Sequence, residues 1–113
     1  MRIAVIGSRD VAAIDFALVG AEPGDVIVSG GARGADTLAA EAAREAGLEV
    51  RVHLPDYARH GRAATHIRNR EIVADCDRLV AFWDGESKGT ASTIAYAHRC
   101  GKPVQIFEVA ANG

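Results

Sequence analysis

Ser29-Gly30-Gly31-Ala32-Arg33-Gly34-Ala35-Asp36 is the stretch that decides the fold of this chain. It follows a short β-branched run at residues 25–28 and precedes an alanine-rich segment at 37–46, which stops at Gly47. A β-branched run, a glycine cluster and an alanine-rich segment in this order predict a strand, a tight turn and a helix. The rest of the chain repeats this strand-and-helix unit.

The turn itself carries features of an anion site. Gly30, Gly31 and Gly34 let the backbone approach a ligand closely, and the N–H groups of a first helical turn favour a negative charge. Arg33 adds a planar, permanently charged guanidinium. We therefore expect these residues to bind a phosphate-like group. The alternative is a tight turn that carries a solvated arginine.

Apolar runs and turn residues divide the remaining chain into alternating elements. A long aperiodic segment at 53–64 is expected to form a loop or lid beside the site, and the tail at 110–113 is expected to fray. Strands are predicted at 3–6, 25–28, 48–52, 78–83 and 103–107. Helices are predicted at 11–19, 37–46, 64–74 and 90–100.

This alternation predicts an α/β fold: a Rossmann-like, doubly wound sheet of about five parallel strands with helices on both faces, in one domain over residues 1–113. In such folds ligands bind beyond the carboxyl ends of the central strands. If the strand order is 3-2-1-4-5, which the sequence leaves open, the loops after the first, second and fourth strands meet in one cleft. Those loops begin at Gly7, Gly30 and Asp84.

Composition limits the function classes. With a net charge of −2 and 5% aromatic residues, the chain lacks the basic field and the stacking surfaces of a typical nucleic-acid binder. Cys76 and Cys100 have no metal-ligand spacing, which favours a reduced, intracellular protein. The N-terminus leads directly into a strand pattern, and no apolar run approaches the ~20 residues of a membrane span. We expect a cytoplasmic protein without a membrane association.

Common cofactor motifs are missing. The first strand is followed by Gly7 alone, so the G-x-G-x-x-G fingerprint of dinucleotide-binding dehydrogenases is not met. Lys88-Gly89-Thr90 has the residue types of a Walker A loop in the wrong order. No cysteine and histidine cluster indicates zinc, and no histidine stands out as a base. We expect neither a metal nor a resident cofactor.

Four motifs, taken together, resemble those of the SLOG superfamily, named for the Smf/DprA and LOG proteins, and most closely its small YspA-like and cpYpsA-related members. The resemblance implies a Rossmann-like domain that binds nucleotides or nucleotide-derived ligands, as a homodimer or higher homo-oligomer. The motifs are Ile6-Gly7-Ser8-Arg9, the stretch 29–36, Ile67-Arg68-Asn69-Arg70-Glu71 and Asp84-Gly85-Glu86-Ser87-Lys88-Gly89-Thr90.

Relatives of the LOG type are phosphoribohydrolases that cleave the N-glycosidic bond of a nucleoside monophosphate. They carry an arginine before the fourth strand, where Arg68 stands, and a P-G-G-x-G-T-x-x-E loop. Gly89-Thr90 matches its G-T, but Thr93 replaces its glutamate. The resemblance thus implies that hydrolysis is slow or absent, unless another acid replaces that glutamate. The candidate acids are Glu71, Asp84 and Glu86.

Several candidate residues have a structural and a functional interpretation. Ser8 either caps the next helix or joins Arg9 on the anion. Asp36 either favours the helix dipole or accepts ribose hydroxyls or a metal-bridged phosphate. Thr90 is a helix-cap candidate whose hydroxyl can face a phosphate. Trp83 either packs in the core or stacks on a base.

The resulting hypothesis is a sensor or processing module that binds a nucleoside monophosphate, ADP-ribose or an NAD-like ligand. N-glycosidic hydrolysis is the alternative, and single-stranded nucleic-acid binding is a weaker one. The ligand, the pathway and the oligomer size are left open. The ligand-binding set is Gly7, Ser8, Arg9, Gly30, Gly31, Arg33, Gly34, Asp36, Arg68, Asn69, Gly89 and Thr90, and the catalytic candidates are Arg68, Glu71, Asp84 and Glu86.

Overall fold

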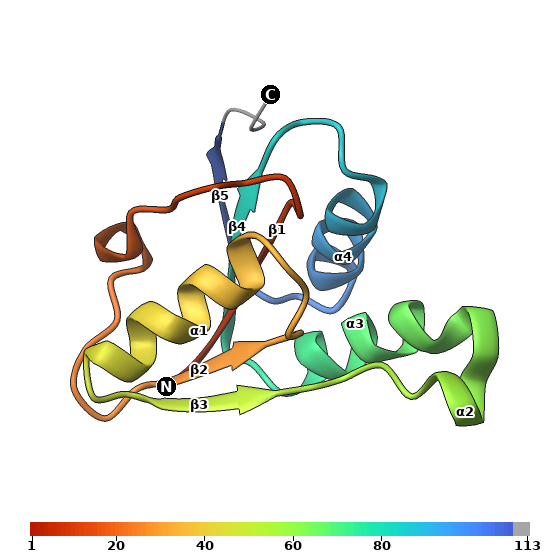
Figure 1. Ribbon diagram of the computed structural model, residues 1–113, viewed down its shortest axis with the longest axis horizontal. Coiled ribbons are helices and arrows are strands. Elements are labelled where there is room, and N and C mark those ends of the chain that lie inside the picture. The colour runs from red at the N-terminus through yellow and green to blue at the C-terminus, as the bar shows by residue number, and fades with distance from the viewer. Residues whose placement is uncertain (110–113) are drawn as a thin grey trace.

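A computed structural model describes residues 1–109 and has a five-stranded sheet at its centre (Figure 1). The strands follow the order β3-β2-β1-β4-β5, and all four neighbouring pairs are parallel. Both the parallel sheet and the strand order assumed from the sequence are therefore confirmed. The strands are β1 (Arg2–Gly7), β2 (Val26–Ser29), β3 (Glu49–Val52), β4 (Arg78–Trp83) and β5 (Val104–Glu108).

Alternate residues of the central strands supply two separate cores. On one face, Ala4 and Ile6 of β1 pack with β4 residues under α3 (Ala64–Ala74) and α4 (Lys88–Arg99). On the other face, Ile3 and Val5 pack under α1 (Ala35–Glu45) and the short 3₁₀ helix η1 (Phe16–Val19). Because both faces are covered, β1 is apolar along its length rather than alternating. Figure 1 shows α1 on one side of the sheet and α3 and α4 on the other.

The alanines of α1 explain how closely this helix can lie on the sheet. Ala35, Ala39 and Ala43 are fully buried and recur every four residues, so they form one narrow face of the helix. Their small side chains keep the start of α1 next to the end of β1. A Cβ atom on Gly7 would lie only 2.5 Å from the Cβ atom of Ala35. This contact places the first and second loops side by side.

The helix predicted at residues 11–19 is wrong, since only the single turn η1 forms there. Asp15 accepts a hydrogen bond from the Ala17 N–H and starts this turn, and Gly20, at φ 68°, ends it four residues later. Val11 still reaches the core, but from an extended segment. An extended chain spans about twice the distance per residue of a helix, so these few residues can cross the end of the sheet.

Smaller corrections concern the two loops beside the site. The segment predicted as a loop at 53–64 contains the short helix α2 (Tyr57–His60) and the turn η2 (Gly61–Ala63). Helix α4 starts at Lys88, two residues earlier than predicted. Its cap is Ser87 rather than Thr90, because the Ser87 hydroxyl accepts from the Thr90 N–H. The predicted frayed tail, 110–113, lies outside the described residues.

The helices are short. Within residues 1–109, no helix has the length and apolar character needed to cross a membrane.

Candidate functional site

A cleft of about 460 Å³ opens at the carboxyl edge of the sheet. Its walls come from the loops after β1, β2 and β4, the first turn of α1 and the first two turns of α3 and α4, so the predicted convergence of the three loops is confirmed. The lining residues are Ile6, Gly7, Arg9, Asp10, Ala32, Arg33, Asp36, Thr65, Arg68, Asn69, Asp84, Glu86, Ser87, Gly89, Thr90 and Thr93.

Arg68 is the most buried cation of this cleft, with 6% of the residue exposed. One nitrogen, Nη1, donates to the Gly30 carbonyl, and Nε donates to Asn69 Oδ1 at 2.9 Å. Nη2 donates to no acceptor in residues 1–109, and no carboxylate of this part of the chain lies within 4.0 Å of the guanidinium. Asp36 is near enough for its charge to interact with Arg68 but forms no ion pair with it. A buried charge that lacks a direct ion-pair partner is costly, so Arg68 favours an incoming anion.

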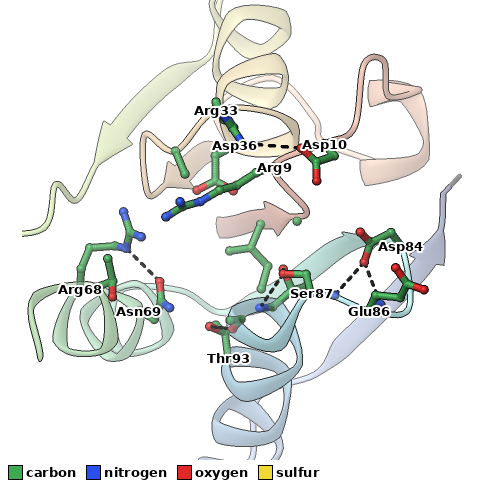
Figure 2. A pocket seen from close by; sticks show the side chains of 16 residues that line it. Arg9, Asp10, Arg33, Asp36, Arg68, Asn69, Asp84, Glu86, Ser87 and Thr93 are labelled. Carbon is green, nitrogen blue, oxygen red and sulfur yellow. Dashed lines mark hydrogen bonds and ion pairs between the residues drawn. The ribbon is translucent and has the colours of Figure 1, made fainter. Parts of the chain in front are cut away.

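Arg9 and Arg33 add two further cations, in different orientations. Figure 2 shows the guanidinium groups of Arg9 and Arg68 reaching into the same space, whereas Arg33 turns toward Asp10. Arg33 and Asp10 form an ion pair at 3.6 Å, and 76% of the Arg33 side chain is exposed. Arg9 and Arg68 therefore define the centre of positive charge, and Arg33 lies at its rim.

Asp36 is a buried carboxylate at the same place, with 5% of the residue exposed. Its Oδ2 accepts the Gly30 N–H at 3.2 Å. Burial raises the pKa of Asp36 to about 6, although the charge of Arg68 and hydrogen bonds from backbone amides oppose this rise. A Cβ atom on Gly30 would lie 2.7 Å from Asp36 Oδ2 and 2.9 Å from Arg68 Nη1. Only glycine fits between the two charged groups.

The two helix N-termini differ in the N–H groups that they leave free. In the first turn of α1, the Ala35 and Thr37 amides donate to the Ser8 and Ala32 carbonyls, so the expectation that α1 presents free amides is wrong at these positions. In α4, Lys88 and Gly89 donate to no acceptor in the described part of the chain. Gly89 lines the cleft, so α4 offers a free amide to an anion there. In α1, the Asp36 amide also donates to no acceptor in the described residues.

The loop after β4 is held by its own hydrogen bonds. Asp84 Oδ1 accepts the N–H groups of Glu86 and Ser87 at 2.9 and 2.8 Å, and these bonds lower the pKa of Asp84. The Asp84 N–H donates to the Ser8 hydroxyl at 3.0 Å. Trp83 Nε1 donates to the Ser87 carbonyl, and its ring packs against the core beside α4. Trp83 lines neither pocket, which supports its core interpretation over base stacking.

Five predicted site residues lie outside this cleft, and three of them, Ser8, Gly34 and Glu71, line no other hollow described here. Ser8 is buried and joins the first loop to the loop after β4. Gly34, at φ 81°, packs its α-carbon against the Ser8 and Arg9 carbonyls. Glu71 is exposed on α3 and lies 3.8 Å from His53. The residues that the cleft does bring together are Gly7, Arg9, Arg33, Asp36, Arg68, Asn69, Asp84, Glu86, Gly89 and Thr90.

A second hollow of about 380 Å³ adjoins this cleft. It contains the predicted Gly30 and Gly31, and it shares Arg9, Arg33 and Arg68 with the main cleft. Its far wall is Leu54, Pro55 and Tyr57. Sequence reasoning placed the segment 53–64 beside the site but selected none of these residues. The sequence signal that could have identified them is the presence of Leu54, Pro55 and Tyr57 close together in an otherwise polar loop.

No metal-binding group of three or more histidine, cysteine, aspartate or glutamate side chains occurs within the described residues.

Comparison with known proteins identifies the family. A family model described as the YspA, cpYpsA-related SLOG family matches residues 1–60, which include the first loop, the glycine stretch and Leu54 to Tyr57. The chain belongs to the YspA, cpYpsA-related SLOG family. A relative, the Gene 61 protein of Mycobacterium phage D29, is 41% identical over 90 residues, which cover 74% of this chain and 72% of the phage protein. No solved structure matches the chain significantly.

Proposed function

We propose that this SLOG protein binds a nucleotide or a nucleotide-derived ligand, such as a nucleoside monophosphate, ADP-ribose or an NAD-like molecule. The phosphate lies between Arg9 and Arg68, with the free amides of α4 at Lys88 and Gly89 on the opposite side. Arg33 lies at the rim of the cleft, beside the phosphate. The family suggests a nucleotide-related role, and the charge and shape of the cleft support it.

The observation that carries this proposal is the buried guanidinium of Arg68. Arg68 lines the cleft, its Nη2 has no protein acceptor in residues 1–109, and its other nitrogens fix its position through Gly30 and Asn69. An arginine that is both fixed and incompletely paired can donate to a phosphate with little loss of side-chain entropy. Asn69 and Asp36 lie next to it and can bind ribose hydroxyls.

Calorimetric titration with AMP, ADP-ribose and NAD tests the proposal. We expect at least one of them to bind, and Arg68→Gln to weaken that binding about 10- to 150-fold, the effect of losing a charged hydrogen bond of about 1.5–3 kcal/mol. Arg44→Ala, on α1 outside both pockets, is the control and should bind as the wild type does. Lack of binding to all three ligands at millimolar concentration would contradict the proposal, as would normal binding by Arg68→Gln.

N-glycosidic hydrolysis is a second candidate, favoured by one observation. A carboxyl whose pKa is raised to about 6, that of Asp36, lies in the cleft and has the character of a general acid. Among the acids considered from the sequence, Glu86 lines the cleft, and its carboxylate has no hydrogen bond to the described residues. Asp84 already accepts two backbone N–H groups, and Glu71 lies outside.

We expect hydrolysis to be slow or absent, because Thr93 occupies the position of the LOG glutamate and donates its hydroxyl to the Gly89 carbonyl at 2.9 Å. Release of free base from AMP, followed by chromatography, measures this. Turnover of about 1 s⁻¹ or faster would favour the enzyme. In that case Asp36→Asn and Glu86→Gln identify the acid, and Asp84→Asn and Glu71→Gln serve as comparisons.

A cytoplasmic location and a homodimer or higher homo-oligomer complete the proposal. Both come from the family resemblance and the sequence.

A further inference from the structure

We propose that Leu54, Pro55 and Tyr57 form a base-binding subsite that receives the nucleobase of the ligand whose phosphate lies at Arg9 and Arg68. This inference rests on the proposed function, because it assigns the second hollow to the other end of the same ligand. It also fixes the direction in which that ligand lies.

The first argument is continuity between the two hollows. Arg9, Ala32, Arg33 and Arg68 line both of them, so a molecule held by these arginines reaches into either space. The main cleft contains the free Gly89 amide at the start of α4, a favourable partner for an anion. Leu54, Pro55 and Tyr57 line only the second hollow. A molecule whose anionic end reaches the Gly89 amide can therefore place its uncharged end against these three residues.

The second argument is the clustering of exposed apolar side chains. Val52, Leu54 and Tyr57 are three of the six large apolar residues that are exposed in the described chain, and they lie within six residues of each other. Leu54 is 70% exposed and Tyr57 is 59% exposed. Single exposed apolar residues are ordinary, but a cluster at the rim of a pocket indicates a binding surface.

The third argument is the shape of the hollow. Its floor is the backbone of Gly30 and Gly31, and a Cβ atom on Gly31 would lie 2.9 Å from Leu54 Cδ2 and 3.0 Å from Val52 Cγ1. Gly31 also has φ 70°, which a side chain rarely tolerates. Leu54 therefore packs directly on Gly31, which holds its side chain in the wall of the hollow beside Pro55 and Tyr57. A planar base, whose faces are apolar, can lie against this wall while the arginines hold the phosphate.

Binding of AMP and of ribose 5-phosphate, which has the phosphate but no base, tests the subsite. Stacking of a base on an aromatic ring has an effect of about 5- to 150-fold. We therefore expect Tyr57→Ala to weaken AMP binding by a factor in this range and to leave ribose 5-phosphate binding unchanged. Tyr57→Phe keeps the ring and should bind AMP normally. Leu54→Ala should also weaken AMP binding, whereas Leu18→Ala, an exposed leucine outside both pockets, should not.

The outcomes separate this inference from the proposed function. If AMP binds and Tyr57→Ala and Leu54→Ala bind it as tightly as the wild type does, the base lies elsewhere and the subsite is wrong, while the phosphate site stands. The same conclusion follows if Tyr57→Ala weakens ribose 5-phosphate and AMP equally. If the wild type binds none of AMP, ADP-ribose, NAD and ribose 5-phosphate, the proposed function fails and the subsite with it. Circular dichroism of each variant confirms that it is folded.

Discussion

At the residue scale, the cleft combines opposite charges in a small space. Arg9 and Arg68 face each other, yet Asp36 is buried beside them and lies close enough to Arg68 for their charges to interact. A carboxylate weakens the attraction for a phosphate, so it is expected there only if it serves another part of the ligand or the fold. Its hydrogen bond from Gly30 serves the fold, and its position in the wall of the cleft allows it to accept a ribose hydroxyl.

The raised pKa of Asp36 has a consequence for stability. The pKa of Asp36 is about 4 in the unfolded chain and about 6 in the folded protein. Between these two pH values the folded protein keeps a proton on Asp36 that the unfolded chain has lost. Stability therefore falls as pH rises through this window and is constant above it. In urea unfolding, the stability of the wild type minus that of Asp36→Asn should fall by at most about 3 kcal/mol between pH 4 and pH 7, since each pKa unit corresponds to about 1.4 kcal/mol.

Subtracting the stability of Asp36→Asn from that of the wild type removes the contribution of the other acids. Asp25, Asp77 and Asp84 have lowered pKa values, so they change stability in the opposite direction at lower pH in both proteins alike. A difference that stays constant from pH 4 to pH 7 would show that Asp36 is ionised as easily in the fold as in water.

Arg33 can be tested separately from the fold. Its side chain is largely exposed and pairs only with the exposed Asp10 within residues 1–109, so Arg33→Ala should change the free energy of unfolding by no more than about 0.5 kcal/mol. If Arg33 turns from Asp10 to the phosphate, the same variant weakens AMP binding by about 1.5–3 kcal/mol. Calorimetry and urea unfolding of one sample measure both. Normal AMP binding by Arg33→Ala would show that Arg33 does not contact the phosphate. An unfolded Arg33→Ala protein would show that Arg33 has a structural role.

At the element scale, the start of α4 is free for a ligand in a way that the start of α1 is not. The first turn of α1 is covered by Gly34 and by carbonyl groups of the first loop. At Gly89 no heavy atom of the described residues lies within 4 Å of an added Cβ atom. Nothing in the packing requires glycine at this helical position, so the absence of a side chain there serves the open cleft.

Gly89→Ala and Gly34→Ala should therefore behave oppositely. Alanine at 89 favours the helix by up to about 1 kcal/mol, but its methyl group crowds the Lys88 and Gly89 amides and should weaken AMP binding about tenfold. Alanine at 34 would place Cβ 2.4 Å from the Ser8 carbonyl at φ 81°, which should cost about 2–4 kcal/mol of stability. Thermal unfolding and calorimetry measure both variants. Unchanged binding by Gly89→Ala would exclude α4 from the phosphate site.

The sequence predicted an element well where its residue pattern is compatible with only one kind of secondary structure. Buried runs such as residues 3–6 and the alanine-rich α1 were located to within two residues. Residues 11–19 were not, because Val11 and Ile14 are buried or packed on the core from a segment without helical structure, as they would be from a helix. Spacing alone does not separate these two cases. Only the cap at Asp15 and Gly20 limits the helix to one turn.

For the site, sequence located the loops better than it ranked their side chains. The convergence of three loops followed only if the strand order was 3-2-1-4-5, which the sequence left open and the structure shows. Arg33 attracted attention because it lies within the glycine stretch, but Arg68, from a helix 35 positions later, is the one held inside the cleft. Ser8 and Asp84 prove to be bonded to each other. Such pairings depend on side-chain directions that one sequence does not specify.

At the scale of the whole molecule, the sheet brings together segments that are distant in the chain. Strands β1 and β4, neighbours in the centre of the sheet, carry the first loop and the loop that ends at α4 (Figure 1). One ligand would contact residues from Gly7 to Thr93 and link both halves of the sheet. This arrangement suits a protein whose central property is to hold a small charged molecule at one edge.

A crystal structure with AMP at saturating concentration tests this central claim most directly. We predict phosphate oxygens at hydrogen-bond distance, about 2.7–3.2 Å, from the guanidinium groups of Arg9 and Arg68 and from the Gly89 amide. A nucleotide bound on another face, or a phosphate in the cleft that contacts neither Arg9 nor Arg68, would contradict the account.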